Sequence, residues 1–189
     1  MIPEIFRDLF RDLRTRMEKT VHVLADELKA VRTGRASTHL FDHIKVEYYG
    51  TEVPINQVAT IRIPEPNLVT ISPWEPKMLS VIEKAIRTSD LGLSPVNDGK
   101  MLKIPIPQLT DERREQLVRQ VGKMAEEART AIRMIRRDGN DHVKKAEKEK
   151  QCSEDDAHRA REEIQKLHDE YIKKIDELVS AKEKEIYQH

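Results

Sequence analysis

Hydrophobic residues recur every three or four positions along both ends of the chain, a spacing that predicts long amphipathic helices. The first stripe covers residues 5–31 and is expected to end near Gly34, because glycine readily adopts the left-handed conformation of a helix C-cap. A second stripe follows Thr110, and Ser153 with Asp156 resembles a capping box that opens a third helix. Each stripe alone would leave an apolar face in water, so together they predict a three-helix bundle.

Between these two flanks the hydrophobic positions alternate, which is typical of short β-strands. Ile44, Val46 and Tyr48 alternate with polar residues, and further short apolar runs continue to position 107, interrupted by one helical stretch over 78–86. Eight of the nine prolines lie between positions 54 and 107, where a long helix would not tolerate them. The sequence therefore predicts an α+β fold class, in which a small, β-rich α/β domain is inserted into a long three-helix bundle.

The predicted bundle domain consists of residues 1–32 plus 108–189, and the inserted domain of residues 33–107. The chain then crosses between the domains twice, at about 31–37 and at about 105–108. Two crossings restrict the directions in which one domain can swing against the other, so we expect a hinge rather than a loose tether. The residues predicted to form this hinge are Arg32, Thr33, Gly34, Pro105 and Pro107.

The composition of the chain limits the kinds of partner and compartment that we expect. Lys plus Arg and Asp plus Glu both number 34, so the formal net charge is zero although 36% of the residues are charged. Such a protein can attract nucleic acid only through a local basic patch. The single cysteine excludes an internal disulfide and suits a reducing compartment. No apolar run approaches the roughly 18 residues of a membrane span, so we expect a cytoplasmic protein with no membrane contact.

A local basic patch is predicted on the second long helix. Arg129, Arg133, Arg136 and Arg137 occupy offsets of 0, 4, 7 and 8 there. At about 100° per residue the first three fall within an arc of roughly 60°, with Arg137 just beside it. We call these four residues the arginine face. Guanidinium groups one turn apart can form forked hydrogen bonds to successive phosphates, so the row favours nucleic-acid binding.

The same row has a second interpretation. Arginines on helices often form solvated faces or pair with nearby carboxylates, and Glu126 and Asp138 are close enough in sequence to do so. Phosphate binding requires guanidinium groups that face solvent rather than carboxylates or the core. Arg32 and Arg35 stand beside the predicted hinge and can add to the patch only if the fold brings them near.

No catalytic or metal-binding set emerges from the remaining residues. His39 and His43 are four apart but have no matching ligand pair nearby, so a structural or surface role is expected. Cys152 is expected to be a tolerated free thiol, and Trp74 a packing anchor. The chain has no glycine-rich phosphate loop. We therefore expect no enzyme, no metal and no cofactor.

Six short motifs are distributed along essentially the whole chain. They are Val31-Arg32-Thr33-Gly34-Arg35-Ala36-Ser37, Val46-Glu47-Tyr48-Tyr49-Gly50-Thr51, Glu83-Lys84-Ala85-Ile86, Ser89-Asp90-Leu91-Gly92-Leu93, Pro105-Ile106-Pro107-Gln108-Leu109-Thr110 and Ile135-Arg136-Arg137-Asp138. Through these motifs the sequence closely resembles the bacterial ribosome recycling factors. The motifs occur in the order found in the family, and only their combination is specific.

The resemblance implies an L-shaped, monomeric molecule that enters the ribosome after peptide release. It implies that the factor acts with elongation factor G, which hydrolyses the GTP, to separate the subunits for reuse. Arg129, Arg133 and Arg136 match the family's contact with large-subunit ribosomal RNA, and Arg136 matches its most sensitive position. Arg32 and Arg35 match the other basic positions. Gly139 departs from the usual alanine, and glycine inside a helix is expected to loosen it locally.

Two other classes of function compete with this interpretation. A structural adaptor would bind a partner protein through exposed apolar positions of the bundle and would tolerate loss of the arginines. An enzyme would need a pocket with perturbed acids or a metal. Binding to ribosomes across a salt series separates these classes, because only phosphate contacts make affinity depend steeply on salt.

Overall fold

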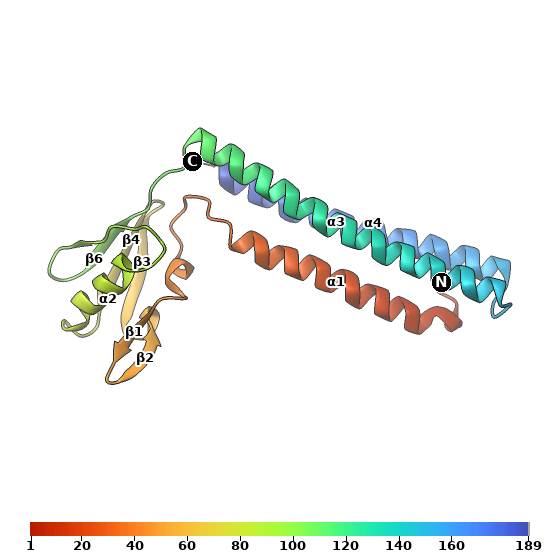
Figure 1. Ribbon diagram of the computed structural model, residues 1–189, viewed down its shortest axis with the longest axis horizontal. Helices are drawn as coiled ribbons and strands as arrows, with labels where there is room; N and C mark the ends of the chain where they lie inside the picture. Colours follow the sequence, from red (N-terminus) through yellow and green to blue (C-terminus); the bar gives the residue numbers. More distant parts are fainter. Residues whose placement is uncertain (189) are drawn as a thin grey trace. The chain divides into compact units, whose positions relative to one another are not determined.

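The computed structural model describes residues 1–188 and divides into two compact units (Figure 1). The helical unit contains Met1–Arg32 and the chain from Asp111 onward, and the small unit is Thr33–Thr110. The second boundary therefore falls between residues 110 and 111 rather than between 107 and 108. The three extra residues belong to the small unit because Leu109 packs within it, against Gly34.

The helical unit is built from three long helices that lie side by side (Figure 1). Their bounds, with those of the short 3₁₀ turn η1 before them, are η1 Glu4–Phe6, α1 Arg7–Lys29, α3 Asp111–Lys148 and α4 Glu154–Tyr187. The Ser153 hydroxyl accepts from the Asp156 N–H at 3.0 Å, as expected for the cap that opens α4. The first helix stops earlier than predicted, because Ala30 and Val31 donate to carbonyls of the preceding turn and close the helix before Gly34.

Buried side chains of the three helices form one apolar core. On α1 they are Phe10, Leu13, Met17, Leu24 and Leu28; on α3 they are Leu117, Val121, Ala125, Ala128, Ile132, Ile135, Val143 and Ala146; on α4 they include Ala157, Ala160, Ile164, Leu167, Tyr171 and Ile175. These positions have the predicted helical spacing, so burying the stripes against one another holds the helices together. Among residues 1–188, no helix is long and apolar enough to cross a membrane.

Gly139 lies inside this core rather than on a loosened stretch. The helix α3 continues through it without a break, so the expected loosening is not seen. A Cβ atom added at Gly139 would lie 2.7 Å from Leu13 Cδ1 and 3.2 Å from Ile164 Cδ1. The missing side chain therefore lets α1 and α4 approach α3 closely at this level of the bundle.

The small unit contains two antiparallel sheets and one helix. Its elements are η2 Thr38–Phe41, β1 Lys45–Tyr48, β2 Thr51–Pro54, η3 Ile55–Gln57, β3 Ala59–Glu65, β4 Leu68–Pro73, α2 Met78–Arg87, β5 Val96–Asn97 and β6 Leu102–Pro105. The first sheet pairs β1 with β2, and the second has the order β3-β4-β6-β5. A core that includes Val69, Ile71, Ile82, Ile86 and Ile104 joins the second sheet to α2. The predicted strand and helix positions match, except that β5 has exposed residues and no alternation to reveal it.

One sequence expectation about this unit is wrong and another stays a prediction. Pro105 pairs with Leu68 at the last position of β6, so the residue predicted for the hinge is also a sheet residue, and its role in a hinge stays a prediction. Trp74 is 64% exposed instead of buried, and its indole N–H donates to Thr60 Oγ1 at 3.0 Å. Flanking prolines keep the tryptophan at the end of β4, but no element covers its ring.

Candidate nucleic-acid interface

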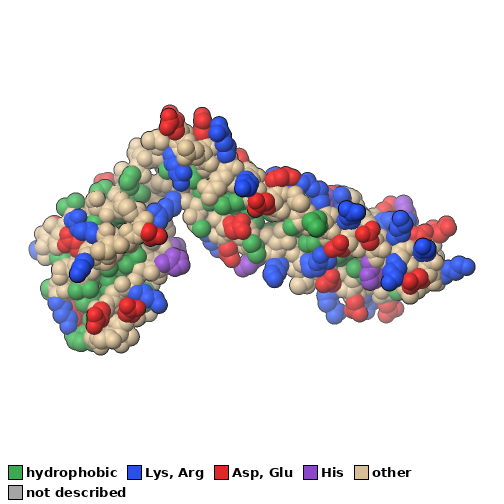
Figure 2. Space-filling view, viewed as in Figure 1, with side chains coloured by type: hydrophobic (Ala, Val, Ile, Leu, Met, Phe, Trp, Pro, Cys, Tyr) green, Lys and Arg blue, Asp and Glu red, His purple; other side chains and the backbone are tan. Residues whose placement is uncertain are grey.

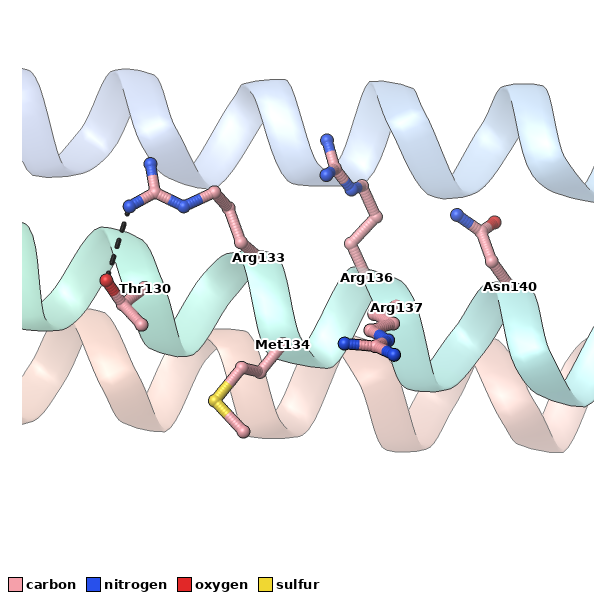
Figure 3. A pocket seen from close by; sticks show the side chains of 6 residues that line it. All are labelled: Thr130, Arg133, Met134, Arg136, Arg137 and Asn140. Atoms are coloured by element: carbon pink, nitrogen blue, oxygen red, sulfur yellow. Dashed lines mark hydrogen bonds between the residues drawn. The ribbon is translucent and has the colours of Figure 1, made fainter.

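The arginine face lies along the middle of α3. Arg133, Arg136 and Arg137 line a shallow surface cavity of about 330 Å³, whose other lining residues are Thr130, Met134 and Asn140 (Figure 3). Figure 3 shows Arg133 and Arg136 extending toward α4, whereas Met134 extends to the other side. Met134 is 62% exposed, so the lining also includes a flexible apolar side chain. The cavity is therefore wide, open and positively charged.

Two members of the arginine face are paired with carboxylates. Asp176 Oδ1 on α4 accepts from Arg129 Nη2 at 2.8 Å, and Glu126 contacts both Arg129 and Arg133. Arg129 and Arg133 therefore do not meet the requirement that the guanidinium groups face solvent rather than carboxylates. The pair to Glu126 was foreseeable from sequence, but Asp176 lies 47 residues from Arg129 and reaches it only because α3 and α4 form a hairpin.

These ion pairs sit on an open surface. The Arg133 and Glu126 side chains are 46% and 59% exposed, and the partly covered Arg129 side chain still has 27% of its surface in contact with solvent. The hydrogen bond from Arg133, followed by the charge of Arg129, holds the pKa of Glu126 below its usual value. Exposed pairs contribute about 0–1 kcal/mol, so a phosphate can replace the carboxylate at little cost.

The other two members of the face keep an unneutralised charge. Within residues 1–188, neither Arg136 nor Arg137 forms an ion pair with a carboxylate. Arg136 Nη1 donates instead to the neutral Gln165 Oε1 on α4, at 3.4 Å. Asp138, the second acid near the row, binds Arg16 on α1 at 2.7 Å and is thereby turned away from the face. Arg136 and Arg137 are thus the members most available to an anion.

The remaining basic candidates divide between the two units. Arg32 is an exposed residue at the end of the helical unit. Arg35 belongs to the small unit, where it lines a shallow cavity with Ala36 and the segment 63–66. The four arginines of the face therefore share one helix, whereas Arg35 belongs to the other unit.

The charge around this face is mixed. In the view of Figure 2, Lys and Arg side chains alternate with Asp and Glu over the helices, so the visible surface has no large region of one sign. This fits the formal net charge of zero. A polyanion would therefore be attracted by a local group of guanidinium groups, not by the field of the whole protein.

The candidates for chemistry stay apart from one another. His39 Nδ1 contacts Asp42 Oδ2 at 3.0 Å on the surface of the small unit, and the described part of the chain has no group of three or more residues able to hold a metal ion. Burial and the nearby Asp156 and Glu147 carboxylates raise the pKa of the Cys152 thiol, which makes it a poor nucleophile.

Sequence reasoning missed the residues that surround Arg136 on α4. Gln165 Nε2 donates to Asp169 Oδ1 at 2.9 Å, and His168 Nδ1 contacts the same oxygen at 2.9 Å. These positions share one helical side because they are three and four residues apart. The cap at Ser153 marks the turn between the two antiparallel helices. Arg136 and Gln165 lie at similar numbers of residues from this turn, one on each helix, so their proximity could have been predicted.

The chain is a two-unit α+β protein, in which a small sheet-containing unit is inserted after the first of three long helices. Similar sequences identify its family. The sequence model described as "Ribosome recycling factor" matches residues 24–187. The ribosome-recycling factor of Symbiobacterium thermophilum is 50% identical over 180 residues, covering 95% of this chain and 97% of its own.

Solved structures agree with this relationship. The solution structure of a ribosome recycling factor matches with a TM-score of 0.77 and 43% identity, covering 100% of both chains. The T. thermophilus ribosome recycling factor, in a study of that factor and E. coli elongation factor G bound to the E. coli post-termination complex, matches with a TM-score of 0.63 and 49% identity. It covers 98% of this chain and 99% of its own. The chain belongs to the ribosome recycling factor family.

Proposed function

We propose that this chain binds the post-termination ribosome through its arginine face and, together with elongation factor G and GTP, promotes separation of the subunits for a new round of translation. The observation that carries the proposal is the row on α3 in which Arg136 and Arg137 have no carboxylate partner among residues 1–188. The family relationship supplies the ribosome and the elongation factor as partners.

The proposed contact is to phosphates of large-subunit ribosomal RNA. Arg136 and Arg137 bind phosphate oxygens directly, while Arg129 and Arg133 exchange their exposed carboxylates for phosphates. Such contacts recognise the shape of the RNA backbone more than its sequence. Arg32 and Arg35 provide further basic contacts in this proposal. The chain acts as a monomer in the cytoplasm, with no metal, cofactor or catalytic step of its own.

The two crossings between the units are proposed to act as a hinge. Gly34 has a φ of 76°, and a Cβ there would lie 3.0 Å from Leu109 Cγ, so the two segments next to the crossings pack against each other within the small unit. Because Pro105 belongs to β6 and Leu109 packs within the small unit, the second crossing is proposed to bend near residues 110–111. The helical unit then holds the RNA while the elongation factor displaces the small unit.

The decisive experiment measures binding to purified ribosomes over a salt series. Arg136→Ala is expected to weaken binding about tenfold or more and to reduce the slope of log K against log salt by about 0.7–0.9, the loss of one phosphate contact. Arg136→Glu should abolish binding at moderate salt without unfolding the protein. Arg113→Ala is the matched control, because it removes the same charge from roughly the opposite side of α3.

Equal affinities of Arg136→Ala, Arg136→Glu and the wild-type protein at moderate salt would rule out this face as the ribosome contact. Unchanged ribosome binding in both variants would favour the adaptor, which would not need the arginines. Circular dichroism and urea unfolding of each variant establish that any loss of binding occurs in a folded protein.

A further inference from the structure

Arg136 differs from its neighbours in how its guanidinium group is held. Arg129 and Arg133 are oriented by the carboxylates of Asp176 and Glu126, which also neutralise them. Arg136 is oriented by the amide oxygen of Gln165, which accepts a hydrogen bond but carries no charge. A carboxylate would both orient and neutralise the guanidinium group. Gln165 orients Arg136 without neutralising it.

The amide of Gln165 is itself fixed in one direction. Its Nε2 donates to Asp169 Oδ1 at 2.9 Å, so its Oε1 must point the other way, toward Arg136 Nη1. Asp169 Oδ1 is also 2.9 Å from His168 Nδ1, and the His168 side chain is only 12% exposed. His168 is thus packed on α4, and it anchors the carboxylate that sets the direction of the amide.

The negative charge in this cluster does not contact Arg136 directly, because Gln165 lies between the two in the hydrogen-bonded chain. Asp169 is its carboxylate, and hydrogen bonds from His168 and then Gln165 keep the pKa of Asp169 below its usual value, so it is ionised at neutral pH. Asp169 is not within ion-pair distance of Arg136. The hydrogen bonds from His168 and Gln165 lower its pKa more than the more distant charge of Arg136 does, so Gln165 orients Arg136 without a direct ion pair to a carboxylate.

We propose that Gln165 is a positioning residue for the RNA contact of Arg136: it orders the guanidinium group before binding and leaves the positive charge available to a phosphate. The inference rests on the proposed function of the arginine face. It explains why the arginine at the centre of that face lacks the carboxylate partner that Arg129 and Arg133 have. A pre-ordered side chain loses less conformational entropy when it binds.

Two substitutions at one position separate orientation from charge. Gln165→Glu keeps the size of the side chain but places a carboxylate on Arg136. We expect it to weaken ribosome binding about tenfold and to lower the salt slope by about 0.7–0.9, as Arg136→Ala does. Gln165→Ala removes the orienting acceptor without neutralising Arg136. We expect it to weaken binding only about threefold with an unchanged slope, since the phosphate contact itself remains.

The chain offers a matched control in Gln116. This exposed residue of α3 also accepts from an arginine, Arg113 Nη1, at 3.1 Å. Gln116→Glu makes the same change in net charge next to an arginine that is outside the face. It should bind ribosomes within about twofold of the wild-type protein. Urea unfolding midpoints of all variants check that none has lost the bundle.

The double variant Arg136→Ala/Gln165→Glu tests whether the two residues act together. If Gln165 works through Arg136, the double variant binds as Arg136→Ala does, apart from the small effect seen for Gln116→Glu. A tenfold loss that persists without Arg136 would mean that the new carboxylate simply repels RNA, and it would overturn the inference.

The remaining outcomes distinguish this inference from the proposed function. Wild-type affinity in Arg136→Ala would reject the proposed function, and the inference with it. Weak binding by Arg136→Ala alongside control-like binding by Gln165→Glu would reject only the inference. Equal losses and equal slopes for Gln165→Glu and Gln165→Ala would also reject it, because the neutrality of the acceptor would then have no effect.

Discussion

Two glycines of α3 show that the effect of a glycine on stability depends on what surrounds it. A Cβ added at Gly122 would meet nothing within 4 Å, whereas one added at Gly139 would lie 2.7 Å from the buried Leu13. Glycine costs a helix about 1 kcal/mol relative to alanine at any interior position. Only at Gly139 does close packing of the helices offset that cost.

This difference predicts opposite results for the same substitution. Gly122→Ala should raise the free energy of unfolding by about 1 kcal/mol, the gain in helix propensity. Gly139→Ala should show no such gain or should lower stability by up to about 1 kcal/mol, because Leu13 must move in a close-packed core. Urea unfolding of the two variants measures both values. Equal stabilisation would mean that the packing around Gly139 adapts freely.

At the scale of the elements, α4 is held to α1 by a buried phenol. The Tyr171 O–H donates to Glu18 Oε2 at 2.8 Å, and the Tyr171 side chain is 1% exposed. Burial and then the hydrogen bond to Glu18 raise the pKa of Tyr171 to about 12. Ionisation of this residue would place a negative charge beside the Glu18 carboxylate.

The raised pKa predicts a loss of stability in alkali. An unfolded tyrosine ionises near pH 10, whereas folded Tyr171 keeps its proton until about pH 12. The unfolded chain thus binds fewer protons in that range, so this contribution to the free energy of unfolding falls as the pH rises from about 10 to 12.

Tyr171→Phe isolates the effect, since phenylalanine keeps the ring and cannot ionise. The stability difference between wild type and variant, measured by urea unfolding at several pH values, should be constant below pH 10. It should shift against the wild type above that pH. A difference that stays constant up to pH 12 would contradict the assignment of the pKa shift to Tyr171.

The elements also show which parts of the fold and of the site could be predicted from the sequence. Helices and strands whose residues alternate between core and solvent have a period, and Ser153 marks the start of α4, so these elements were predictable. The strand β5 has no buried residue, and Gly139 has no apolar side chain, so neither left a periodic signal. The arginine face followed from spacing on one helix, whereas Asp176 and Gln165 became its neighbours only through the packing of α3 on α4.

For the whole molecule, the proposed function assigns different mechanical properties to different parts. The helical unit has three long helices with a shared core, and the proposed function requires it to carry a load along its length. The small unit has its own core of strands and α2. The chain passes from one unit to the other at residues 32–33 and 110–111. Transmission of a push therefore depends on how stiff these two crossings are.

Loosening the crossings should uncouple binding from subunit separation. Two glycines inserted between Arg32 and Thr33, and two more between Leu109 and Thr110, lengthen both connections and leave the arginine face unchanged. We expect ribosome affinity within about twofold of the wild type and loss of most subunit separation driven by elongation factor G, followed by light scattering. The same four glycines inserted after the exposed Gly92 should leave both activities intact. Because a flexible connection cannot transmit a displacement, full separation activity with loosened crossings would show that the factor does not work as a lever.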